Sequence, residues 1–229
     1  KSIYFLFFLS QSKDPFALRR AAIGVFRILL ENGLDLTLIS LLKLGNPDVE
    51  FDDLLNFFEE RARSQFAEEG IRFDVLKSIS IKAYQNISFK EMSQRLWAIQ
   101  NFVATKSGTD LIQGYKRAIN ILNAEENKDG VEYSVEPNVD LFGYEPELIL
   151  NRQLIKVDKK IINDLNKEKP QKALLHLSTL RQPIDNFFNE LQVNSKNTEV
   201  RQNRLCLLNQ IKGVMHRVAD FSKIDLDAN

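Results

Sequence analysis

Residues 12–22 have the sequence Ser-Lys-Asp-Pro-Phe-Ala-Leu-Arg-Arg-Ala-Ala, which is typical of a helix start. Ser12 or Asp14 can cap the free backbone N–H groups of a first turn, and Pro15 stands where a missing N–H does no harm. Apolar side chains then recur at helical spacing, at Phe16, Ile23, Phe26, Leu29 and Leu30. The pattern predicts a helix that ends near Gly33, a common helix stop.

The rest of the chain also favours helices. Glycine and proline are few, at 9 and 6 in 229 residues, and long stretches contain neither. Further helices are predicted over residues 37–44, 51–69, 74–83, 88–103, 109–124, 146–166, 170–191 and 198–221. A turn is expected at Gly45-Asn46-Pro47, Gly70 should end the helix over 51–69, and Ser88 with Glu91 forms a capping box for the helix over 88–103. The buried stripe predicted for the helix over 146–166 is Leu148, Leu154, Ile155, Ile161, Ile162 and Leu165. A break is expected at Ser107-Gly108-Thr109, and Pro183 should kink or break its helix. The predicted fold class is therefore all-α.

Charge is divided unevenly along the chain, although 31 basic and 31 acidic residues cancel in the total. Residues 125–147 carry eight acids and one base, and they lose the apolar periodicity. They are predicted to form a long acidic loop. Residues 148–217 carry 13 bases and six acids. Because the net charge gives no hint of a nucleic-acid binder, such a function has to be argued from local patches.

Patterns for catalysis and for metal binding are missing from the sequence. His176 and His216 are 40 residues apart, and neither has a second ligand three or four residues later that would make a metal site convincing. Neither is directly followed by an aspartate. No Gly-x-x-x-x-Gly-Lys loop is present to hold a nucleotide phosphate. The lone cysteine, Cys206, excludes an internal disulfide and fits a reducing compartment. We therefore predict no catalytic residue, no metal ligand and no bound cofactor in this chain.

The apolar segment 3–9 is too short to span a membrane. Its seven residues compare with the roughly 20 that a membrane-spanning helix needs. A signal peptide would also need a small-residue cleavage site, and the following Gln11-Ser12-Lys13-Asp14 is a poor one. We expect a buried segment, no membrane association and a cytoplasmic location.

Six basic residues are candidates for contact with an RNA backbone, where cations gain by releasing counterions. They are Lys116, Arg117, Arg201, Arg204, Lys212 and Arg217. All but Arg201 have an alternative interpretation. Lys116 and Arg117 lie off an apolar stripe and would suit a solvated pair. Arg204 recurs with core positions and would suit a pair with a carboxylate. Lys212 and Arg217 stand near a helix C-terminus, where the dipole favours positive charge.

Several stretches together resemble the beta subunit of the bacterial heterotetrameric glycyl-tRNA synthetase, in the order expected for its C-terminal portion. They are SKDPFALRRAA at 12–22, GYKRAINIL at 114–122, LRQPIDNFFNEL at 180–191 and VRQNRLCLLNQIKGVMHRVADF at 200–221. From about Thr109 on, the chain also resembles the helical anticodon-binding domain of arginyl-tRNA synthetases, called the DALR domain. The resemblance implies a helical body over 1–107, at the end of an HD-like region, and an anticodon-binding helical bundle over 108–229.

The resemblance also implies a function. In that family, ATP and Mg serve an adenylate-forming site that resides chiefly in the alpha subunit, and the beta subunit mainly binds tRNA. This chain would be a non-catalytic part of an aminoacyl-tRNA ligase, with glycine tRNA and the alpha subunit of an alpha2beta2 assembly as partners. It would hold the anticodon arm. The alternative is a helical protein-interaction scaffold without RNA binding. Bases clustered on one face would favour RNA binding, and bases scattered and paired with acids would favour the scaffold.

Overall fold

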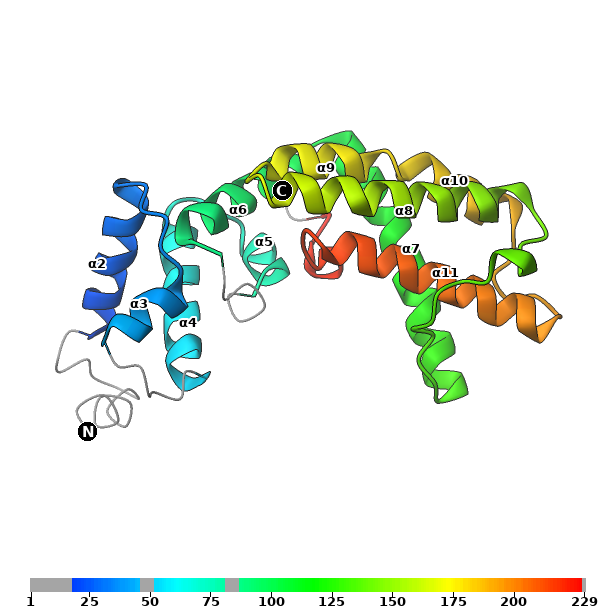
Figure 1. The fold of residues 1–229 in the computed structure, drawn as a ribbon, viewed down its shortest axis with the longest axis horizontal. Helices are drawn as coiled ribbons and strands as arrows, with labels where there is room; N and C mark the ends of the chain where they lie inside the picture. The colour runs from blue at the N-terminus through cyan, green and yellow to red at the C-terminus, as the bar shows by residue number, and fades with distance from the viewer. Residues whose placement is uncertain (1–17, 46–51, 81–86, 228–229) are drawn as a thin grey trace. The chain divides into compact units, whose positions relative to one another are not determined.

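The structure of the protein is a computed structural model that describes residues 18–45, 52–80 and 87–227. Helices connected by turns and loops make up these residues, and no strand occurs among them (Figure 1). The single antiparallel bridge of the described ranges joins Thr37 to Ser88. The predicted all-α class is confirmed for this part of the chain.

By its packing the chain divides into two compact units, residues 1–94 and 95–229. The division falls within one helix, α6 (Phe89–Val103). The domain boundary predicted from the sequence, at 107/108, lies in the first turn of the next helix and stays a prediction. The two units are described separately.

The first unit packs short helices around aromatic rings. It comprises α2 (Leu18–Glu31), α3 (Leu38–Gly45), α4 (Asp52–Glu68), α5 (Phe73–Ser78) and the first turns of α6. The ring of Phe26 on α2 lies 5.6 Å from that of Phe58 on α4 and 4.4 Å from that of Phe89 on α6. These rings join helices distant in sequence, so burial of their apolar area stabilises the unit.

The helix ends in this unit test several predictions. Gly33 and Gly70 follow α2 and α4 with φ of +60° and +97°, which confirms both stops because this region favours glycine. The predicted Ser88 cap of α6 is present, since Ser88 Oγ accepts a hydrogen bond from Glu91 N at 3.2 Å. The helix predicted over 74–83 is too long, because α5 ends at Ser78. The cap predicted at residues 12–15 lies outside the described ranges. Of the turn predicted at 45–47, only Gly45 is described.

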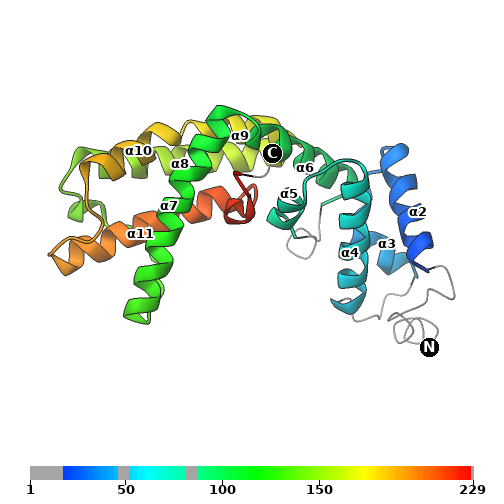
Figure 2. The same cartoon turned by 180° about the vertical axis from the view of Figure 1, so that it is seen from behind.

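The second unit is a bundle built on α8. Its helices are α7 (Lys106–Asp129), α8 (Glu145–Leu165), α9 (Pro170–Ser178), α10 (Arg181–Glu190) and α11 (Thr198–His216), with short 3-10 turns η1 (Val139–Leu141) and η2 (Phe221–Lys223). α9 and α10 follow one another along α8, and α11 packs against α8 as well (Figures 1 and 2). α7 crosses this layer and contacts α10, α11 and η2.

The core of the second unit lies between α11 and the two helices it packs against, α7 and α8. Fully buried members include Leu111, Ile112, Leu122, Leu150, Leu154, Ile161, Leu207 and Ile211. One part of the predicted α8 stripe is wrong, because Ile155 and Ile162 are 43% and 38% exposed. Val157 is buried in their place, so the buried face is rotated around the helix from the predicted one.

Both ends of α7 differ from the predictions. α7 starts at Lys106, and Thr105 caps it by accepting a hydrogen bond from Gly108 N at 3.0 Å, so the break predicted at 107–109 is wrong. α7 also continues to Asp129, so the first five residues of the predicted acidic loop are helical. The predicted break near Pro183 is confirmed, with α9 ending at Ser178 and α10 starting at Arg181.

Candidate nucleic-acid interface

The side of α8 that faces away from the core carries a row of four cations. Leu150, Leu154, Val157 and Ile161 form the buried side of the helix. At 100° per residue the opposite side takes Arg152, Lys156 and Lys159, with Lys160 at its edge, and all four are exposed. They cover about 12 Å of helix length at 1.5 Å per residue. We call these four residues the basic row.

The basic row has no internal counter-charge. None of its four side chains forms a hydrogen bond or an ion pair with another described residue. The two acids within this part of α8 point elsewhere: Asp158 pairs with Arg217 at 2.9 Å, and Asp164 is buried beside His176 at 3.3 Å. The row is therefore free to bind anions. None of its four residues is among the six predicted candidates, although the spacing of 4, 3 and 1 residues within a predicted helix was a sufficient signal.

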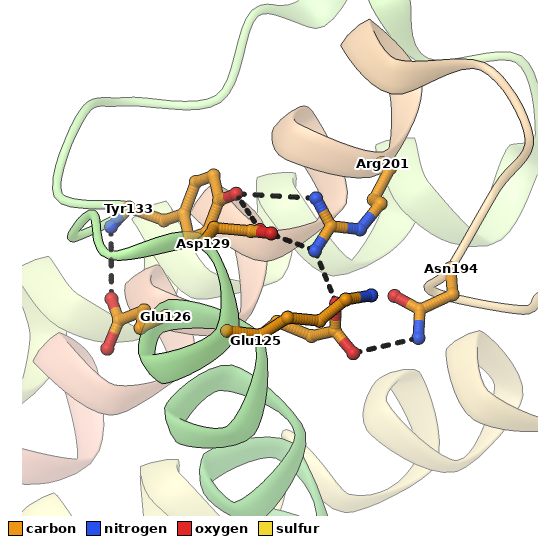
Figure 3. A network of polar contacts seen from close by, with 7 residues as sticks. Glu125, Glu126, Asp129, Tyr133, Asn194 and Arg201 are labelled. Carbon is orange, nitrogen blue, oxygen red and sulfur yellow. Dashed lines mark hydrogen bonds and ion pairs between the residues drawn. The ribbon is translucent and has the colours of Figure 1, made fainter.

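Arg201, one of the six predicted candidates, is held by acids of α7 (Figure 3). Its guanidinium donates to Glu125 and Asp129 and lies 3.4 Å from the Tyr133 hydroxyl. The hydrogen bond from Arg201 lowers the pKa of Glu125. Bonds from Tyr133 and then Arg201 lower the pKa of Asp129. The carboxylates thus stay charged, and the end of α7 is fixed against α11.

Arg204 lies in the core rather than on the surface. Its Nε donates to Glu147 Oε1 at 2.7 Å, and one terminal nitrogen donates to the Gln192 carbonyl at 2.7 Å. The other oxygen of Glu147 accepts from the backbone N–H groups of Gly143 and Tyr144, each at 3.0 Å. This is the carboxylate pairing that the sequence offered as the alternative for Arg204. Its contact with RNA stays a prediction.

The other four candidates are spread over α7, α11 and the turn that follows α11. Lys116 Nζ donates to the Ile224 carbonyl at 2.5 Å, and Arg217 pairs with Asp158 of α8. Arg117 is exposed and lies over the Phe188 ring, 4.5 Å from its centroid. Lys212 is half-buried and helps to lower the pKa of His216, although burial is the larger cause. The structure therefore does not gather the six into one cluster, and their RNA contacts stay predictions.

The acidic connection between α7 and α8 is packed onto α11. Between the contacts of Arg201 and Arg204, Asn203 binds the backbone of Asn138 twice, accepting from its N–H at 2.7 Å and donating to its carbonyl at 2.9 Å. The carboxylates of Glu132, Glu136, Asp140 and Glu145 are exposed and have no ion-pair partner in the described part of the chain. The negative charge is thus concentrated at this connection, where RNA would be repelled.

The described residues offer neither a metal cluster nor a membrane-spanning helix. No group of three or more His, Cys, Asp or Glu side chains is placed to hold a metal ion in residues 18–45, 52–80 and 87–227. Among the helices described, none is long and apolar enough to cross a membrane.

Comparison with known proteins yields two family matches. Residues 8–80 match the family described as glycyl-tRNA synthetase beta subunit. Residues 111–225, half of the chain, match the family described as DALR anticodon binding domain. The second match covers nearly all of the helical bundle around α8, so the bundle has the predicted type of fold.

Individual relatives are named as beta subunits of glycine–tRNA ligase. The chain is 38% identical to the glycine–tRNA ligase beta subunit of Paracoccus denitrificans, with 93% of the chain and 31% of the relative covered. It is also 38% identical to the beta subunit from a Ruegeria species and 39% identical to one from Cereibacter sphaeroides, again over 93% of the chain and about a third of each relative. The chain therefore spans about a third of the length of the curated relatives it matches.

Proposed function

Because this chain belongs to the family of glycyl-tRNA synthetase beta subunits and carries a DALR anticodon-binding domain, we propose that it binds the anticodon arm of glycine tRNA. The observation that carries the proposal is the basic row on α8, within the matched domain. Arg152, Lys156, Lys159 and Lys160 would contact successive phosphates, releasing counterions. Phosphate contacts of this kind position an RNA, and contacts with unstacked bases supply specificity.

The chain's place in the complete enzyme follows from the same family membership. It would hold the tRNA so that the acceptor end reaches an active site elsewhere, chiefly on the alpha subunit, where ATP and Mg would be used. The partners are then glycine tRNA and the alpha subunit in an alpha2beta2 assembly, in the cytoplasm. We propose no catalytic residue in this chain.

Filter binding of glycine tRNA across a salt series tests the proposal. The chain should prefer glycine tRNA over another tRNA, and affinity should fall steeply as salt rises. Replacing the basic row by glutamine should reduce the salt slope by about 3, since each phosphate contact contributes about 0.7–0.9. A matched control removes four exposed lysines elsewhere in the second unit: Lys106, Lys128, Lys196 and Lys223. Equal losses in both variants would refute the role of the row.

The scaffold alternative has one observation in its favour. Several bases of the second unit pair with acids, including Arg181 with Asp110 at 2.8 Å and Arg217 with Asp158. Such pairing is expected of a protein-interaction module. If the unmodified chain binds no tRNA at low salt in the same titration, the scaffold function replaces the proposed one.

A further inference from the structure

Helices α7 and α10 meet in three successive contacts that lead to Arg117. Asp110 pairs with Arg181 at 2.8 Å, Gly114 lies against Ile184, and Arg117 lies over Phe188. Each contact is three or four residues after the one before it on both helices, so the contacts occupy successive turns. The position of Arg117 is thus set by the packing of two helices.

Gly114 allows this approach. A Cβ at this position would lie 3.1 Å from Cγ2 of Ile184, which is closer than ordinary carbon contacts. With hydrogen in place of a side chain, α10 comes near enough to bring Phe188 beneath Arg117. Phe188 is in turn supported by the fully buried Phe187, at 5.3 Å in an edge-to-face arrangement.

Arg117 is therefore held in place by the ring, while its N–H donors stay available for a ligand. Its guanidinium carbon lies 4.5 Å from the Phe188 centroid, and the side chain is exposed. None of its five N–H donors bonds to another described residue. An arginine backed by a ring has lost part of its conformational freedom and still offers the rest of its surface to a ligand.

Two amide side chains flank Arg117 along α7. Gln113 is one turn before it and Asn120 one turn after, at i−4 and i+3, so all three lie on one side of the helix. Both amides are exposed and form no hydrogen bond within the described ranges. A carboxamide offers a donor and an acceptor together, which is the pairing that base edges require.

We propose that Arg117, backed by Phe188, is a stacking platform for one unstacked RNA base, whose edge is bound by Gln113 or Asn120. The proposal rests on the proposed function, because it names a base subsite on the tRNA-binding chain. Guanidinium planes are established stacking partners for unpaired bases in RNA recognition. A phosphate contact would need only the charge of Arg117 and would not use its placement over a ring.

The substitution Arg117→Lys tests the platform, since it keeps the charge and removes the plane. The matched control is Arg217→Lys, at an exposed arginine that pairs with Asp158 and lies over no aromatic ring of the described residues. Affinities of the full chain would be measured for glycine tRNA and for glycine tRNAs with one abasic anticodon-loop position each. Thermal midpoints of both variants should match that of the unmodified chain.

The expected result has three parts. Arg117→Lys weakens binding of intact tRNA about tenfold, in the lower half of the range for one stacked base, with the salt slope unchanged. One abasic tRNA loses a similar factor with the unmodified chain and nothing further with Arg117→Lys, because the two changes remove the same contact. Arg217→Lys does not single out any loop position.

Two results overturn the platform. One is a loss that is equal for every abasic tRNA; the other is an affinity for intact tRNA that Arg117→Lys leaves unchanged. Either result leaves the proposed function intact as long as the unmodified chain binds glycine tRNA. If the unmodified chain binds no tRNA, the proposed function fails, and the platform fails with it.

Discussion

Arg204 and Glu147 form a buried ion pair, with Arg204 Nε 2.7 Å from Glu147 Oε1 and side-chain exposures of 6% and 0%. The pair joins α11 to the first turn of α8. One turn earlier on α11, Arg201 holds the last turns of α7. Two arginines on successive turns of one helix thus fix both ends of the acidic connection, residues 125–147.

Removing one partner of the buried pair should be costly. We expect Arg204→Met to lower the free energy of unfolding by about 3–5 kcal/mol, because the Glu147 carboxylate is left buried without its counter-charge. Urea denaturation followed by circular dichroism measures the loss. Arg152→Met, at an exposed position of α8, serves as the control and should change the value by no more than about 0.5 kcal/mol. Equal stabilities for the two variants would contradict the structural role of Arg204.

The Arg201 contacts should make stability depend on pH in the acidic range. The pKa values of Glu125 and Asp129 are lowered in the folded chain from ordinary values of 4.5 and 3.8. A lowered carboxyl pKa contributes stability above the unfolded-state value, and this contribution is lost as pH falls through the folded-state value. Arg201→Gln should therefore be less stable than the unmodified chain at pH 7, with the gap closing below about pH 4.

Thermal midpoints between pH 7 and pH 3 check this dependence. Arg117→Gln is a suitable control, because Arg117 has no carboxylate partner among the described residues. A gap between Arg201→Gln and the unmodified chain that stays constant down to pH 3 would show that the two carboxylates do not carry the effect.

The helices were predictable because their signals are local. Apolar spacing of three and four residues and the capping serine at Ser88 lie within one segment of chain, and the structure contains those helices. The extent of α7 was mispredicted because Glu125 and Asp129 look like the start of an acidic loop. Their charge is balanced by Arg201, 76 and 72 residues away, which no local pattern reveals. The end of the helix did have a local signal, since Gly130 follows it with φ of +65°, as Gly33 and Gly70 follow α2 and α4.

In the candidate interface, too, some features have local signals in the sequence and others depend on distant residues. The basic row follows from helical periodicity and was available to sequence analysis. The surroundings of Arg204 were not, since the choice between a surface and a core position depends on Glu147, 57 residues away. The ring beneath Arg117 was hidden for the same reason, because Phe188 belongs to another helix.

Lys116 and Arg117 should differ in their effect on stability, although they are adjacent. Lys116 Nζ donates to the Ile224 carbonyl and thereby ties α7 to the segment after η2. A hydrogen bond from a charged group contributes about 1.5–3 kcal/mol, so Lys116→Met should lower the thermal midpoint by several degrees. Arg117→Met removes only an exposed cation–π contact, about 0.5–1 kcal/mol, and should have a smaller effect. Differential scanning calorimetry distinguishes the two, and equal midpoints would contradict the tie to Ile224.

Two glycines of the second unit should respond in opposite ways to alanine. A Cβ on Gly108 would lie 2.1 Å from the Phe102 carbonyl oxygen, a clash with backbone that no side-chain rotation relieves. We expect Gly108→Ala to lower the free energy of unfolding by about 1–3 kcal/mol or more, because the added methyl group would force α6 and α7 apart.

Gly213, within α11, has no atom within 4 Å of the position that a Cβ would take. Gly213→Ala should raise stability by about 0.5–1 kcal/mol, since alanine restricts the unfolded chain and favours helix. Urea denaturation of both variants measures the contrast, and destabilisation by Gly213→Ala would contradict the open space beside that position.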